Sequence, residues 1–128
     1  MGLCVIEGNR GGGGRNGEEF LNAVGSNGFN WWWSYYNPSF PTSGYVEFPD
    51  LDFTNVSSFD FASDGLVSVL VDGTDITSGR TSGTANVNGA TGVTVRTYAN
   101  DTNRGSSAPI RGFRIPRYTD IHGVVHTL

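Results

Sequence analysis

Apolar and polar positions alternate along this chain in short segments, and the strongest pattern lies in residues 58–73. Two apolar runs there, 59–62 and 66–71, are separated by a polar step that contains Asp64-Gly65. An Asp-Gly step between apolar runs predicts a β-hairpin, because glycine adopts the positive φ of a tight turn without steric cost. The second run is apolar on both faces, which predicts a central strand covered on both sides.

A second hairpin is predicted where residues 84–87 and 93–98 flank Asn88-Gly89. Residues 93–98 alternate strictly, so this strand is expected to have one buried face and one face in water. Pro116 places the segment that contains it at a sheet edge or a strand end, because proline donates no ladder hydrogen bond. The remaining predicted strands are residues 2–7, 45–48, 51–54, 109–118 and 121–128.

One short helix is predicted near the N-terminus. Asn16 can cap it, and Glu19 follows three residues later at the positive end of the helix dipole. An apolar stripe and a glycine that can end the helix come next, formed by Phe20, Leu21, Val24 and Gly25.

These elements predict a single all-β domain, an antiparallel β-sandwich or a jelly-roll-like barrel with one short helix. Residues 1–44 hold a Gly-rich N-terminal arm, the helix and an aromatic segment, and residues 45–128 hold the β-sheet body. The arm, residues 8–17, is too rich in glycine to form regular structure by itself. Its glycine spacing fits a dinucleotide fingerprint, but Glu18 and Glu19 would repel a pyrophosphate, and no second βαβ unit follows.

Charge and composition limit the kinds of partner that we expect for this protein. The net charge is −4, and the chain has eight arginines and no lysine. Residues 1–79 carry two arginines against ten acids, whereas residues 80–128 carry six arginines against two acids. The asymmetry predicts either neutralisation within the chain or contact between copies through opposite charges. We expect no nucleic-acid partner and no membrane span, and the N-terminus does not resemble a signal peptide.

No residue pattern indicates an enzyme. Cys4 is the single cysteine, and no Ser, His and Asp set follows a catalytic signature. His122 and His126 would lie about 13 Å apart on a strand, too far to share one ion. Asp50/Asp52 and Asp72/Asp75 do not fit a calcium loop and are expected to start turns. We therefore expect no cofactor and no metal, and we take the glycosylation patterns at Asn55 and Asn100 as chance matches.

The candidate partner-binding residues are aromatic and basic side chains. Three uses of the aromatic run compete: a core anchor, a contact between subunits, or a platform that stacks sugar rings. In a strand at residues 109–118, Arg111 and Arg117 would share a face with Phe113 and Ile115, and Arg114 would point the other way. The full set is Arg10, Arg15, Trp31, Trp32, Trp33, Tyr35, Tyr36, Arg111, Arg114 and Arg117.

In composition the chain resembles small all-β virion proteins of tailed bacteriophages, such as capsid cement (decoration) proteins or fibre-tip domains. The resemblance rests on the Gly-rich arm at 8–17, the Ser/Thr/Asn-rich stretch at 74–92 and the missing lysine. It implies a non-enzymatic structural protein of the virion, made in the host cytoplasm, that binds copies of itself and a shell protein. The alternative is a carbohydrate-binding or receptor-binding β-domain that uses residues 31–36.

Overall fold

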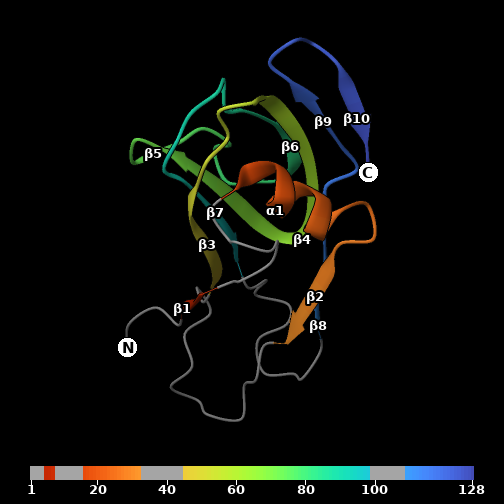
Figure 1. The fold of residues 1–128 in the computed structure, drawn as a ribbon. Helices are drawn as coiled ribbons and strands as arrows, with labels where there is room; N and C mark the ends of the chain where they lie inside the picture. Colours follow the sequence, from red (N-terminus) through yellow and green to blue (C-terminus); the bar gives the residue numbers. More distant parts are fainter. Residues whose placement is uncertain (1–4, 8–15, 33–44, 99–108) are drawn as a thin grey trace.

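A single curled sheet forms the body of the molecule and closes about half of a barrel (Figure 1). The computed structural model describes residues 5–7, 16–32, 45–98 and 109–128. Its elements are β1 (Val5–Glu7), α1 (Gly17–Val24), β2 (Phe29–Trp32), β3 (Tyr45–Leu51), β4 (Val56–Val71), β5 (Thr74–Asp75), β6 (Arg80–Asn86), β7 (Val93–Tyr98), β8 (Pro109–Phe113), β9 (Arg117–Asp120) and β10 (Val125–Thr127). The predicted all-β class with one short helix is confirmed.

The main sheet has the strand order β1-β3-β7-β4-β9-β10. Strands β5 and β6 pair with the other edge of β4, and β2 and β8 form a separate antiparallel ribbon. Strands β1 and β3 are parallel, whereas the other pairs in the main sheet are antiparallel. β4 is therefore the strand from which the sheet is built.

The predicted hairpin at residues 58–73 is wrong, because β4 runs without reversal through Asp64-Gly65. Its N-terminal half lies between β6 and β9, and its C-terminal half lies between β7 and the β5–β6 side. The register with β6 jumps between Ala62 and Val67, so a long bulge replaces the turn. The chain reverses at the next Asp-Gly step, Asp72-Gly73, whose φ values of 51° and 78° suit a tight hairpin turn.

The predicted hairpin between residues 84–87 and 93–98 is also wrong. Val67 pairs with Arg80 of β6 and with Thr97 of β7, which places these two strands on opposite edges of β4. The alternation of β7 itself is confirmed, since Val93, Val95 and Thr97 are buried and the residues between them are half-buried. The predicted strand at residues 109–118 is divided: β8 ends at Phe113, and Pro116 lies in the gap before β9.

The helix fills the open side of the curled sheet (Figure 1). The Asn16 side chain accepts a hydrogen bond from the Glu19 N–H at 3.0 Å, and Gly25 ends the helix at a φ of 60°, both as predicted. The stripe of Phe20, Leu21 and Val24 is buried. The Phe20 ring packs against three rings of the sheet and its connections, those of Phe48, Phe53 and Phe113.

The two faces of the second apolar run of β4 are covered to different degrees, since Ser68 on the face of Leu66 is buried and Leu70 there is half-buried. Val67 and Val69 are fully buried, but Leu66 on the other face is 49% exposed. The expectation that both faces are covered is therefore wrong at Leu66. Val67 and Val69 belong to the core that the apolar stripe of α1 also enters.

Candidate functional site

The aromatic segment and the arginine-bearing strand are brought together in the β2–β8 ribbon. Trp31 pairs with Ile110 and Trp32 with Pro109, in the strand that also contains Arg111. Arg10, Arg15, Trp33, Tyr35 and Tyr36 lie outside the described residues. The choice between core, subunit contact and sugar platform for this segment therefore stays a prediction.

Arg114 and Arg117 have different environments. Arg114 is exposed, and Phe113 and Ile115 beside it are buried, as the alternation predicted. Arg117 is also exposed, so the prediction that it shares the face of Phe113 and Ile115 is wrong. The gap around Pro116 shifts the alternation, and Tyr118 becomes the next buried residue. Arg117 instead forms an ion pair with Asp60 across the sheet, at 2.8 Å.

The β9–β10 hairpin projects from the body of the molecule (Figure 1). Its tip carries apolar side chains. Ile121, Val124 and Val125 are 50%, 53% and 57% exposed, respectively. Together with Leu66 they are the large apolar side chains that the described part of the chain leaves most open to water. Exposed apolar residues gathered on one projection are typical of a contact surface, whereas isolated ones are not.

This tip was not found from the sequence, which predicted residues 121–128 as one strand of the sheet. The turn at residues 121–124 is held by Asp120, whose Oδ1 accepts hydrogen bonds from the N–H groups of His122 and Val124 at 2.8 and 3.1 Å. A turn-initiating Asp three residues before a glycine, Gly123, was the signal that could have indicated it. An apolar pair at positions 124–125 directly after such a turn could then have been expected at a hairpin tip.

Side-chain contacts at the base of the β9–β10 hairpin stabilise it. His126 Nε2 lies 2.8 Å from Asp120 Oδ2, and its ring stacks on Tyr118 with 4.5 Å between centroids. Burial, and next the Glu18 carboxylate, raise the pKa of the Tyr118 hydroxyl. The Ile121 N–H donates to the Asn55 carbonyl at 3.1 Å, which fastens the turn to the loop before β4. These contacts fix the turn that carries the apolar tip to the body of the molecule.

No described strand pairs with the outer edge of β10. Asp120 N–H donates to the Val124 carbonyl, and Leu128 N–H donates to the Pro116 carbonyl, each at 2.9 Å. Because bonded and non-bonded pairs alternate in an antiparallel ladder, the backbone groups of Val125 and Thr127 point away from β9. Within the described part of the chain, β10 pairs with β9 alone. An open edge of this kind can accept a further strand.

No protein-family model, curated protein or solved structure matches this chain. The function is therefore inferred from the geometry of the described residues.

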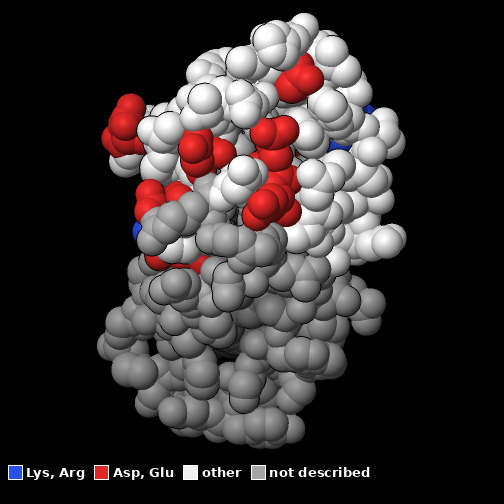
Figure 2. Space-filling view, in the orientation of Figure 1, with Lys and Arg blue, Asp and Glu red and all other residues white. Residues whose placement is uncertain are grey.

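The charge asymmetry of the sequence is partly neutralised within the chain. Arg96 pairs with Glu47 and Arg117 with Asp60, each at 2.8 Å, and both pairs join the basic C-terminal part to the acidic N-terminal part. Acidic side chains still dominate the face that carries α1, as Figure 2 shows. Arg96 and Arg117 are therefore engaged within the chain, which leaves fewer arginines for the predicted contact between copies through opposite charges.

The described residues contain neither a cluster of metal-ligating side chains nor a helix that could span a membrane. No group of three or more His, Cys, Asp or Glu side chains is placed there to hold an ion. His122 lies in the turn, whereas His126 contacts Asp120 and Tyr118. In the described ranges, α1 is far too short to cross a membrane, and no other helix qualifies.

Proposed function

We propose that this protein is a non-enzymatic assembly module that binds protein through its β9–β10 hairpin. The observation that carries the proposal is the exposed tip of Ile121, Val124 and Val125 on a braced hairpin with an open edge. Burying a half-exposed Val or Ile on a partner stabilises a complex by about 1 kcal/mol each, so the tip alone supports a modest contact. Backbone hydrogen bonds along the open edge of β10 would fix the orientation of the partner.

The bracing of the turn favours binding over a purely structural role. A flexible tip would lose conformational entropy on docking, whereas Asp120 and His126 already hold this one in place. Exposed apolar side chains in a preformed turn give the folded monomer little stability. They are useful when a second surface covers them.

The occupant that we propose is a second copy of the chain, with β10 pairing to β10 across a two-fold axis. Two-fold dimers are the commonest homo-oligomers, and an antiparallel edge can pair with itself in this symmetry. A shell protein could use the same edge in an assembled particle. In its finer form the proposal is a capsid cement or decoration protein of a bacteriophage virion, and that form rests on the compositional resemblance alone.

Light scattering after size exclusion tests the proposal, with loading concentrations from about 10 μM to about 1 mM. We expect the mass to rise toward that of a discrete oligomer. Val125→Pro should abolish the rise, since it removes an N–H from the outer edge and leaves the bonds to β9 intact. Val124→Glu should also abolish it by placing a charge in the contact.

Leu66→Glu is the matched control, because Leu66 is about as exposed as the tip residues but lies on β4. It should leave the oligomer unchanged. A wild-type monomer at every concentration would overturn self-association through this hairpin. An oligomer that survives Val125→Pro and Val124→Glu would show that another surface assembles the protein.

A further inference from the structure

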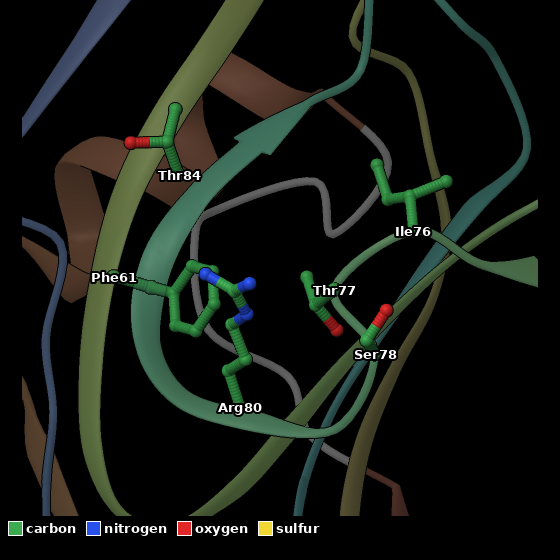
Figure 3. Close-up of a pocket in the computed structure, with 6 residues that line it drawn as sticks. All are labelled: Phe61, Ile76, Thr77, Ser78, Arg80 and Thr84. Carbon is green, nitrogen blue, oxygen red and sulfur yellow. The ribbon is translucent and has the colours of Figure 1, made fainter.

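A pocket of about 220 Å³ lies between β4, β6 and the loop that joins β5 to β6 (Figure 3). It is distant in sequence from the hairpin and plays no part in the function proposed above. Its lining combines one aromatic ring, one aliphatic side chain, three hydroxyl-bearing residues and one guanidinium. These belong to Phe61, Ile76, Thr77, Ser78, Arg80 and Thr84.

The pocket exists because two strands lose their register. Ala62 pairs with Ser82 but Val67 pairs with Arg80, so residues 63–66 of β4 face a single residue of β6. Gly83 pairs with Phe61, and its missing side chain keeps space open beside the ring. A Cβ at Gly83 would lie 3.6 Å from Phe61 Cζ and 3.7 Å from Arg80 Cδ, which places both side chains around the same space.

Most hydroxyl groups of the lining are already engaged. Thr77 Oγ1 is 2.8 Å from the Val67 carbonyl and 2.6 Å from Asp75 Oδ1, so its one proton is committed within the protein. Thr84 Oγ1 donates to Asp60 Oδ1 at 2.7 Å. The guanidinium of Arg80 and the hydroxyl of Ser78 make no side-chain hydrogen bond to another described residue and remain as donors for a ligand.

Arg80 differs from two other described arginines, Arg96 and Arg117, in whether it forms an ion pair. Arg96 and Arg117 each form an ion pair, whereas Arg80 forms none with a described carboxylate. Asp75 lies on the loop that supplies the pocket wall, but Ser68 and Thr77 donate to its oxygens. Burial alone would raise the pKa of Asp75, yet the Thr77 hydroxyl and N–H hold it below its usual value. Among the described residues, the guanidinium of Arg80 is therefore a charge at this pocket without an ion-pair partner.

We propose that the Phe61–Arg80 pocket binds a carboxylate group carried on a small apolar body. The guanidinium fork matches the two oxygens of a carboxylate, and Ser78 can donate to the same group. The Phe61 ring and the Ile76 side chain provide the apolar surface against which such a body can pack. The carboxylate could belong to a free aromatic acid or to an acidic side chain of another protein, and the test separates these sources.

The test is an amide and arginine side-chain NMR titration of the ¹⁵N-labelled full chain at low ionic strength. Benzoate is the probe for a free aromatic acid, and N-acetyl-glutamate N-methylamide is the probe for an acidic side chain. Benzoate should shift the signals of residues 76–80 and of the Arg80 Nε–H, with a dissociation constant on the order of millimolar. Benzamide, which has the same ring and no charge, should bind at least about tenfold more weakly.

Arg80→Gln should weaken benzoate binding roughly tenfold or more, and Arg114→Gln should leave it unchanged. Arg114 is a suitable control because it is also exposed and pairs with the opposite edge of β4. If only the glutamate probe binds at the pocket, the source is an acidic side chain. The proposal is overturned if neither acid shifts the pocket signals up to about 20 mM. It is also overturned if the shifts persist in Arg80→Gln, which would indicate unspecific pairing with arginines.

Discussion

The hydroxyl of Thr77 lies 2.8 Å from the carbonyl oxygen of Val67, ten residues earlier in the chain. The same hydroxyl oxygen lies 3.3 Å from the Val69 N–H, so it can accept from that group as well. Thr77 is buried. Its side chain forms the hydrogen bonds to Val67 and Val69 of β4 that a neighbouring strand would otherwise form. A second buried threonine, Thr97 on β7, has a hydroxyl without a hydrogen-bond partner among the described residues.

Thr77→Val should lower the free energy of unfolding by about 1–3 kcal/mol, because it leaves buried backbone groups of β4 without a partner. Thr97→Val has the same shape change and should raise that free energy by about 1 kcal/mol, since it removes an unpaired buried hydroxyl. Urea denaturation of both variants measures the difference. Equal effects at the two positions would contradict the role assigned to Thr77.

Val69→Asp should unfold the domain. It would bury a carboxylate without a partner in the core between β4 and α1, at a cost above about 4 kcal/mol, which approaches the whole stability of a small domain. Leu66→Asp places the same charge on the exposed face of the same strand and should change stability by less than about 0.5 kcal/mol. Circular dichroism and one-dimensional NMR report the outcome. A folded Val69→Asp variant would show that β4 is not the centre of the core.

The helix could be predicted completely from the sequence, and the reversal in residues 58–73 could not. Asn16, the apolar stripe and Gly25 act over a few residues, so local patterns determine them. Asp64-Gly65 and Asp72-Gly73 give the same local turn signal, but only the second is used. At the first, β4 continues because β6 and β7 pair with its two edges, and both strands lie far along the chain. A local pattern does not contain that information.

The candidate site shows the same limit. Val124 and Val125 are of the same residue type as the valines of the core, so their identity does not show that they are exposed. The turn held by Asp120 brings them to the surface. The pocket at Phe61 and Arg80 depends on a register jump between strands that are separated in sequence. Charge, by contrast, was informative: within the part of the chain that the structure describes, ion pairs from Arg96 to Glu47 and from Arg117 to Asp60 join the two oppositely charged halves.

Gly17→Ala should destabilise the protein by about 1–3 kcal/mol, although alanine is the better helix former. A Cβ at Gly17 would lie 2.2 Å from Phe53 Cδ1 and 2.6 Å from the Asp52 carbonyl oxygen. The Phe53 ring is fully buried and cannot move aside easily. Asn22→Ala, at an exposed position of the same helix, is the control and should be neutral or slightly stabilising. Thermal denaturation of the two variants decides this prediction.

Acid should loosen the β9–β10 hairpin with a midpoint set by Asp120. The hydrogen bond with His126, and next that from the Val124 N–H, hold the pKa of the Asp120 carboxyl below its usual 3.8. The charged form is therefore favoured in the folded state. Its contribution is complete above the unfolded pKa and is lost as the pH falls through the lower folded value. NMR titration of the Asp120 carboxyl carbon should give a midpoint below 3.8, with the Val124 amide following the same curve.

Asp120→Asn separates the charge from the shape of the turn. The amide oxygen can still accept from the N–H groups of His122 and Val124, but the side chain cannot ionise. In this variant the Val124 amide should lose the transition centred on the Asp120 midpoint. A wild-type Asp120 midpoint at or above 3.8, or the same Val124 transition in Asp120→Asn, would show that another group controls the hairpin. Because the apolar tip depends on this turn, self-association of the wild type should weaken over the same range of pH.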